Sequence, residues 1–324
     1  MDPSARPRAV SELVPPPISR TIFSGLNQPG RTLCNEDATM DEEDIRNAAP
    51  DPQIHGSDAD EPGADDPPDT NRWGKYVYCI IETTESLALG PIGLGEEGKS
   101  DVYTIHHGDL AAVVSDTPMH LYDPTRENLL SHELVNETVM KHHTVIPMSF
   151  GTIFRTEEDV AELLHSTKSA FRDVLDQIRG KIELGLKVIW DRDQVVEQIE
   201  EEHEEIAALR KEIAEATHGS TYFARMQLGR LVETALEERA EQYVSEIYER
   251  LKPLAVATRS GKLIGDTMVM NAAFLVDCSR EEAFDSEVRA LNEQYQDVLD
   301  FQYTGPWPPY NFVNITLELE RADS

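Results

Sequence analysis

Apolar residues first recur at the spacing of regular secondary structure at Trp73. The stretch YVYCII, residues 76–81, is apolar on both faces, which is typical of a strand at the centre of a sheet. Two further strands are predicted at 102–106 and 110–115, where short apolar runs flank a His-Gly-Asp turn at 107–109. The ordered part of the chain is therefore expected to begin with three strands.

Helical spacing follows these strands in two places. Asp123 is the predicted N-cap of a helix that runs to about His142, and the extended segment TVIPMSF comes after it. Thr156 and Asp159 have the spacing of a capping box. Apolar residues with a period of 3.6 then continue this second helix until Gly180 ends it.

The stretch KIELGLKVIWD, residues 181–191, alternates between apolar and other residues, which predicts a strand. Its apolar face carries Ile182, Leu184, Leu186, Val188 and Trp190. We place the end of a first α+β domain, residues 73–191, after this strand.

A second domain, residues 192–324, is predicted to begin with a helical hairpin. Residues 193–252 are rich in Glu and Arg, and isoleucines recur every seven residues from Ile199, as in two packed helices. An α+β unit follows at 255–320. Its predicted elements are strands at 267–277, 298–303 and 313–319 and a helix with its N-cap at Ser279.

The first 72 residues differ in composition from the rest. Residues 1–72 hold 11 of the 19 prolines and 15 acidic against 6 basic side chains, without an apolar period. We therefore predict a disordered, acidic, proline-rich tail. The composition changes within it at Met40, which leads to the hypothesis that Met40 is the native start.

The charge of the chain limits its partners. Acidic side chains outnumber basic ones 61 to 29, giving a formal charge of -32, and such a surface repels nucleic acid and anionic lipid. No run of about 18 apolar residues and no secretory signal is present, so we expect a cytoplasmic protein without a membrane span. The 20 Arg and only 9 Lys lead to the hypothesis of a high-salt cytoplasm.

Motifs for catalysis or cofactor binding are weak. GLGEEG at 93–98 matches a dinucleotide-binding pattern, but it leads into a strand and holds two glutamates where a pyrophosphate would bind. HELVN at 132–136 lacks the second His of a zinc motif, so we assign His132, Glu133 and Glu137 to a solvated helix surface. No nucleophile has an evident base. The sequence therefore predicts no catalytic residue, no metal site and no cofactor.

Two segments are apolar where loops are usually polar: IPMSFGTIF at 146–154 and GPWPPYNFV at 305–313. In the first, Gly151 permits a turn between aromatic residues that either close the core or form an exposed contact. In the second, three prolines fix the backbone, so the loop is either a rigid anchor for a partner or a brace on its own sheet. The candidate contact residues are Trp307, Pro308, Pro309, Tyr310, Phe312, Pro147, Phe150 and Phe154.

These two segments, together with YVYCII at 76–81, GDLAAVVS at 108–115 and KVIWD at 187–191, resemble the gas vesicle protein GvpF/GvpL family. The similarity runs in order along most of the chain, and GPWPPYNF is its most specific part. Where the family commonly has Arg in a P-x-R-F-G-T segment, this chain has Ser149, which removes a positive charge.

The resemblance implies a non-enzymatic accessory protein in gas vesicle assembly, associated with gas vesicles in the cytoplasm. The implied partners are the small hydrophobic shell protein and other gas vesicle accessory proteins. The implied fold is α+β, with two domains that contain ferredoxin-like mixed sheets, the second carrying the long helical hairpin and the whole preceded by the acidic tail.

Two hypotheses of different classes follow. A soluble acidic protein with a helical hairpin and a stiff aromatic loop is suited to hold an aggregation-prone apolar segment before it joins a shell. The alternative is a small-ligand or nucleotide-binding α/β enzyme with no recognisable catalytic motif. A convergent polar pocket would favour that alternative.

Overall fold

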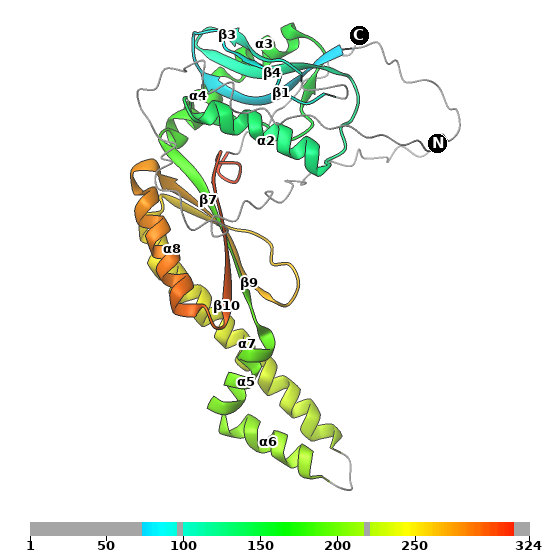
Figure 1. Cartoon of the computed structure of the whole chain (residues 1–324), viewed down its shortest axis with the longest axis vertical. Helices are drawn as coiled ribbons and strands as arrows, with labels where there is room; N and C mark the ends of the chain where they lie inside the picture. Colours follow the sequence, from blue (N-terminus) through cyan, green and yellow to red (C-terminus); the bar gives the residue numbers. More distant parts are fainter. Residues whose placement is uncertain (1–72, 96–99, 217–220, 314–324) are drawn as a thin grey trace, which may run out of the picture. The chain divides into compact units, whose positions relative to one another are not determined.

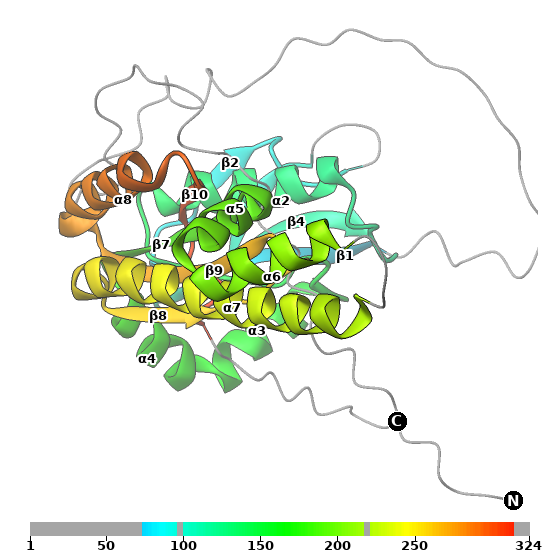
Figure 2. The same ribbon diagram turned by 90° about the horizontal axis from the view of Figure 1, so that it is seen from below.

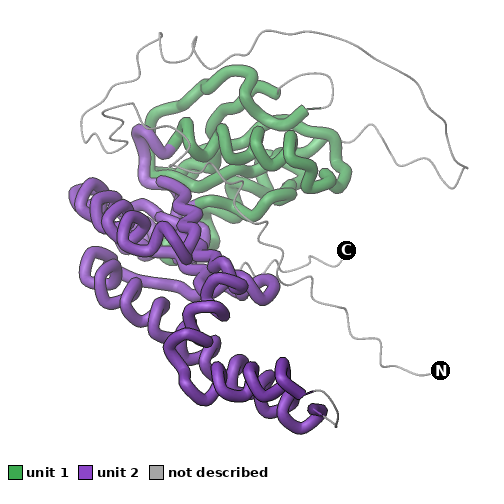
Figure 3. Tube along the Cα trace, turned by 60° about the horizontal axis from the view of Figure 1, so that its bottom comes forward, with its two compact units in different colours: residues 1–19, 39–139, 147–171 green, residues 20–38, 140–146, 172–324 purple. Residues whose placement is uncertain are grey.

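The computed structural model describes residues 73–95, 100–216 and 221–313. The predicted tail at 1–72, the second half of the GLGEEG motif (residues 96–98) and all but the first residue of the strand predicted at 313–319 lie outside the described residues. The described chain forms two compact units, which Figure 3 shows in different colours. Of the described residues, unit 1 contains 73–95, 100–139 and 147–171, and unit 2 contains 140–146, 172–216 and 221–313.

The first sheet has the strand order β2-β3-β4-β1-β5, and β6 also pairs with β1. Its strands are β1 (Trp73–Glu82), β2 (Ala88–Gly90), β3 (Val102–His107), β4 (Leu110–Pro118), β5 (Val145–Pro147) and β6 (Ile153–Phe154). Strand β1 pairs antiparallel with β4 and with β6. All of residues 76–81 are buried, which confirms the prediction of a central strand from YVYCII.

Between residues 119 and 180 the chain forms three helices: α2 (Arg126–Met140), α3 (Glu157–Ser166) and α4 (Lys168–Ile178). The capping box of Thr156 and Asp159 is confirmed. The single helix predicted after it is wrong, because the chain leaves helical geometry at Thr167 and starts again as α4. The first helix begins later than predicted, since the Asn128 backbone N–H donates to Thr125 Oγ1 and Thr125 takes the capping position assigned to Asp123.

The second sheet is antiparallel at every pair and has the order β10-β7-β9-β8. Its strands are β7 (Lys181–Trp190), β8 (Ala257–Ser260), β9 (Met268–Asp277) and β10 (Leu299–Trp307). Numbered in chain order, the strands read 4-1-3-2, with helices between the first two and the last two. This is a ferredoxin-like β-α-β-β-α-β unit. The prediction of a mixed sheet is wrong here.

Strand β7 joins a different sheet from the one expected. Residues 181–190 were predicted to end the first domain, but β7 lies between β10 and β9 as an inner strand of the second sheet. An alternating pattern identifies a strand and its buried face, but not the sheet that the strand joins. The short strand β8 was not predicted at all.

The helices of unit 2 are α5 (Arg192–Glu202), α6 (Glu204–Glu215), α7 (Tyr222–Leu251) and α8 (Glu281–Tyr295), with short 3₁₀ turns at Lys252–Leu254 and Cys278–Arg280. The predicted helical hairpin is present, but its first arm is broken at His203, which has extended backbone angles. Figure 1 shows α7 continuing from the sheet alongside α5 and α6, and Figure 2 shows α6 beside α7. Within the described residues no helix is both long enough and apolar enough to cross a membrane.

One hydrophobic core joins the hairpin to the second sheet. It contains the predicted apolar face of β7 and the buried residues of both hairpin arms, including Val195, Ile199, Ile206, Leu236 and Ile247. Phe274 of β9 and Phe284 of α8 add an aromatic pair with ring centroids 5.1 Å apart. The hairpin is therefore an extension of the ferredoxin-like core rather than an independent domain.

Candidate functional site

The segment GPWPPYNFV forms the end of β10 and a tight turn on its own sheet. Trp307 pairs with Glu183 of β7, after a register shift that follows Thr304. The turn is closed by backbone hydrogen bonds from Tyr310 N to Pro308 O, at 2.7 Å, and from Phe312 N to Pro309 O, at 3.0 Å. The prolines thus shape a turn that returns toward the sheet.

Gly305 is required at the start of this turn. It has a φ of +124°, and the peptide bond to Pro306 is cis. A Cβ atom at this position would lie 2.9 Å from the Glu183 carbonyl oxygen and 3.0 Å from Leu184 Cδ2. Only glycine permits both the backbone angle and the close approach of β10 to β7.

Burial of the segment follows from this geometry. Trp307, Pro308 and Pro309 are buried, with Trp307 only 7% exposed, whereas Tyr310 and Phe312 are half-buried. Trp307 Nε1 is buried and has no hydrogen-bond acceptor among the described residues. A side chain this buried reaches a partner only if the turn moves, so the arrangement matches a brace on the sheet better than an exposed anchor.

Glu183 is the residue in this site that sequence reasoning missed. Its side chain is 5% exposed, and its two carboxylate oxygens accept hydrogen bonds from the Asn311 backbone amide, at 2.8 Å, and from Asn311 Nδ2, at 2.6 Å. Burial raises the pKa of Glu183 to about 7, although the two hydrogen bonds from Asn311 act in the opposite direction. The strand pattern assigned Glu183 to the polar face of β7, and no local signal indicates that a residue 128 positions away covers it.

The second apolar segment, IPMSFGTIF, packs in unit 1. Pro147 of β5 and Phe154 of β6 are buried, and Phe150 between them is half-buried. The Phe150 ring meets the ring of Tyr76 edge-on, with centroids 6.2 Å apart. Gly151 has a φ of +83° and donates its amide to Tyr76 Oη at 2.9 Å. These contacts favour the core-closing role over the exposed contact for this segment.

His132 corrects another prediction, because it is 2% exposed rather than solvated. Its Nδ1 lies 2.9 Å from Tyr76 Oη, and its ring packs against Phe150 with centroids 5.9 Å apart. Burial lowers the pKa of His132 to about 4, so the imidazole is neutral at pH 7. The helical spacing of residue 132 from Val135 and Val139, both buried, was the available signal for this orientation.

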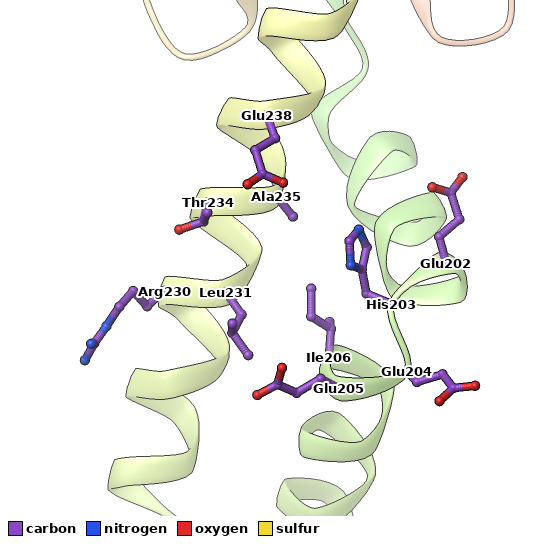
Figure 4. Close-up of a pocket in the computed structure, with 10 residues that line it drawn as sticks. All are labelled: Glu202, His203, Glu204, Glu205, Ile206, Arg230, Leu231, Thr234, Ala235 and Glu238. Carbon is purple, nitrogen blue, oxygen red and sulfur yellow. The ribbon is translucent and has the colours of Figure 1, made fainter.

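A hollow of about 400 Å³ opens between the two arms of the hairpin. Figure 4 shows Ile206 from α6 and Leu231 and Ala235 from α7 pointing into the gap between the helices. The remaining lining residues are Glu202, His203, Glu204, Glu205, Arg230, Thr234 and Glu238. No local pattern predicts this hollow, because it depends on the break in the first arm.

The beginning of α7 exposes large apolar side chains. Tyr222, Phe223 and Met226 are 65%, 73% and 46% exposed, and the Tyr222 and Phe223 rings lie 5.6 Å apart. We call these three residues the hairpin tip. Contiguous exposed apolar side chains of this size are uncommon on a soluble protein without a binding role.

Comparison with known proteins identifies the family. Residues 74–314 match the family model described as gas vesicle synthesis protein GvpL/GvpF. The chain is 32% identical over 249 residues to gas vesicle protein F1 of Halobacterium salinarum, which covers 76% of this chain and 95% of that protein. It is 25% identical over 288 residues to gas vesicle protein L of Haloferax mediterranei, which covers 74% and 87% respectively.

The fold agrees with a solved structure as well. The crystal structure of the gas vesicle protein GvpF from Anabaena sp. PCC7120 superposes with a TM-score of 0.66 and 25% sequence identity, covering 75% of this chain and 99% of that one. The match in sequence and the match in structure both extend over most of the chain. This chain therefore belongs to the gas vesicle synthesis protein GvpL/GvpF family.

Proposed function

We propose that this chain is a non-enzymatic accessory protein of gas vesicle assembly, which binds the small hydrophobic shell protein and other accessory proteins while vesicles form. The observation that carries this proposal is the family match over residues 74–314, which includes both units. The relatives are named as gas vesicle proteins, so the alternative of a small-ligand enzyme is not favoured. The protein acts in the cytoplasm, in association with the vesicles.

The charge of the chain supports a role in holding an apolar partner. A small hydrophobic shell protein exposes apolar surface until it is assembled, and such surface aggregates unless it is covered. A partner with a formal charge of -32 keeps the complex soluble through charge repulsion. Binding and release without a chemical step suffice for this role.

The two apolar segments contribute to this role in different ways. We assign a bracing role to the five buried candidates, which hold the adjoining surface in place. These are Trp307, Pro308, Pro309, Pro147 and Phe154. The half-buried Tyr310 and Phe312 keep part of their rings accessible and are the proposed partner contacts, whereas the half-buried Phe150 packs against Tyr76 and His132 and belongs with the brace.

Co-purification tests the proposal directly. The full chain, carrying an affinity tag, is co-expressed with gas vesicle shell and accessory proteins and recovered at low and at high salt. We expect the wild type to retain the shell protein. Tyr310→Ala combined with Phe312→Ala should reduce the retained amount, whereas Leu263→Ala combined with Ile264→Ala, which alters an exposed apolar pair elsewhere in unit 2, should not.

Two results would count against the proposal at different levels. Failure of the wild-type chain to retain any gas vesicle protein, under both salt conditions, would overturn the assembly role. Equal retention by the wild type and by the folded Tyr310 and Phe312 variant would leave that role in place and would remove these two residues as contacts.

A further inference from the structure

The strand β8 leaves one edge of the second sheet open. In the order β10-β7-β9-β8, β8 pairs with β9 on one side, and no strand among the described residues pairs with its other side. Figure 2 shows β8 beyond β9, on the side of the sheet away from β10. The strand has four residues, and Val256 just before it is 53% exposed. An open edge of this kind offers backbone donors and acceptors to an added strand.

The open edge lies in a basic part of an acidic chain. Residues 252–265 contain three basic and no acidic side chains, whereas the whole chain has a formal charge of -32. Arg259 and Lys262 are exposed, and in the described part of the chain neither forms an ion pair. A strand that carries acidic side chains would therefore be attracted to this edge.

The chain itself contains a segment with this chemistry. After Val313 the sequence continues as NITLELERADS, residues 314–324, which lie outside the described residues. Leu317 and Leu319 alternate with Glu318 and Glu320, a pattern that predicts a strand with one apolar and one acidic face. Residues 317–320 are also as many as the four residues of β8.

The strand register places the end of the described chain close to the open edge. Asn311 donates two hydrogen bonds to the side chain of Glu183, so it lies over β7. Glu183 pairs with Leu275 of β9, and Leu275 pairs with Ala257, the first residue of β8. Asn311 is therefore two strand spacings from β8, or about 10 Å at about 4.8 Å per spacing. After leaving β10, the chain has crossed part of the sheet in the direction of β8.

The length of the chain permits it to reach the edge. A strand added outside β8 lies three spacings from β7, a distance of about 14 Å. Residues 312–316 span up to about 17 Å when extended, at about 3.3 Å per residue, which leaves 317–320 to pair with β8. Trp307 and Ala257 lie at the same end of the sheet, because both align with Glu183 through the strand register. A strand that starts at this end runs parallel to β8.

The two faces of such a strand match the two faces of β8. Cross-strand partners share a face of a sheet, so Ala257 and Arg259 lie on the face that carries Glu183. Ser260 lies on the opposite face, where its Oγ is 3.0 Å from Tyr248 Oη of α7. With its glutamates on the Arg259 side, the added strand places its leucines on the helix side of the sheet.

The other edge of the sheet fits this segment less well. Strand β10 also has one open side in the part of the chain that the structure describes. Its exposed residue is Asp300, which repels a strand that carries glutamates. The turn after β10 also leads over β7, away from this edge, because Asn311 is held on Glu183.

We propose that residues 317–320 add a fifth strand to the second sheet, parallel to β8, with Glu318 and Glu320 beside Arg259. The segment covers the open edge of its own chain. An uncovered edge pairs with strands of other chains, so this docking protects β8 from such pairing while the segment is in place. The inference is independent of the proposed function, because it concerns the isolated chain.

Amide hydrogen exchange of the full chain tests the proposal. Gly261 N donates to Asn271 O of β9, so the alternation of a strand places the N–H groups of Thr258 and Ser260 on the outer edge of β8. In Leu317→Ser with Leu319→Ser, these two amides should exchange about tenfold faster than in the wild type. Exchange is followed by mass spectrometry of fragments that cover residues 256–262, and the amides of β9 serve as the internal control.

Charge reversal tests which face of the segment meets the edge. Arg259→Glu with Lys262→Glu should speed exchange in β8, and so should Glu318→Lys with Glu320→Lys. The four changes together should restore slow exchange, because they reverse both sides of the contact. The matched control is Arg225→Glu with Arg230→Glu, which reverses two exposed charges on α7 and should leave exchange in β8 unchanged.

Three results would overturn the proposal. The first is equal exchange at Thr258 and Ser260 in the wild type and in the leucine variant. The second is faster exchange in β10 instead of β8 when the leucines are replaced, which would place the segment at the other edge. The third is slow exchange that is lost on dilution, which would show that the added strand comes from a second copy of the chain.

Discussion

Two aromatic-rich segments of unit 2 have opposite relations to solvent. The segment at 305–313 ends β10, and its Trp307 is 7% exposed. The hairpin tip at the start of α7 carries Phe223, which is 73% exposed. In the sequence the first segment has the stronger features of a binding loop, because three prolines stiffen it. In the structure the second segment has the accessible surface.

The two segments differ in exposure because residues elsewhere in the chain cover the first segment but not the second. The turn at 305–313 has Glu183 beneath it, and this carboxylate accepts two hydrogen bonds from Asn311 that hold the turn on β7. The hairpin tip lies at the start of α7. In this part of the helix, Leu228 and Leu231 are the residues that pack against the core. An aromatic residue is therefore buried or exposed according to its partners in the fold, and stiffness alone does not make an anchor.

The largest expected effect separates the two segments by stability. Trp307→Ala should lower the free energy of unfolding by about 3–5 kcal/mol, because it removes a large buried side chain and leaves a cavity. Phe223→Ala serves as the exposed comparison in the same urea titration. If Trp307→Ala lowers the free energy of unfolding no more than Phe223→Ala does, the assignment of Trp307 as a brace is contradicted.

A pH titration should reveal the buried carboxylate. The folded-state pKa of Glu183 is about 7, above its ordinary value of 4.5, so Glu183 binds its proton more tightly in the folded protein. Its contribution to stability is then fully present below pH 4.5 and is lost as the pH rises through 7, by up to about 3 kcal/mol.

The measurement for this prediction is the difference in unfolding free energy between the wild type and Glu183→Gln at pH values from 4.5 to 8. The wild type should lose stability relative to the variant across this range. Burial also raises the pKa of Glu281 to about 7, but this group is present in both proteins and cancels in the difference. A difference in unfolding free energy that does not change with pH would show that folding does not raise the pKa of Glu183.

Asn311→Ala should have a smaller, pH-dependent effect. The substitution removes the side-chain donor at 2.6 Å from Glu183 and keeps the backbone donor. At pH 8, where the carboxylate is charged, the loss should be about 2 kcal/mol, because hydrogen bonds to charged groups are the stronger ones. At pH 5 the loss should be smaller, and an equal loss at both values would argue against a charged acceptor.

The smallest stability effect belongs to the hairpin tip. Phe223→Ser with Met226→Ser should change the free energy of unfolding by no more than about 0.5 kcal/mol, because both side chains are exposed on the surface of α7. Thermal unfolding of the double variant beside the wild type measures this. A large loss of stability would mean that the tip is part of the core rather than an exposed surface.

Local patterns predicted many individual elements of this fold. The buried strand β1, the capping box before α3, the strand β7 and the helical hairpin all have signals within a few neighbouring residues. The breaks at Thr167 and His203 were missed, because apolar spacing on both sides of each break continues the helical period. The strand β8 has no buried residue, and its pattern of four residues is too short and too exposed to detect.

The candidate site was predicted less well than the fold. The motif around Trp307 was found because its composition is unusual, but composition does not determine which way the ring points. His132 was assigned to the surface even though its spacing from Val135 placed it on the buried face of α2. Glu183 carried no signal, since a glutamate in an alternating strand normally faces water.

Residue order alone predicts the α+β class, most of the helices and strands, the excess of acidic charge and the resemblance to a gas vesicle family. These properties depend on residue type and short-range spacing, which the chain carries in any conformation. Tertiary contacts place β7 in the second sheet, bury Trp307 while Phe223 stays exposed, and bring Asn311 to Glu183. Each of these features depends on contacts between residues far apart in the chain. Bringing such residues together costs loop-closure entropy, and this cost is offset by burial and hydrogen bonds that form only between distant segments.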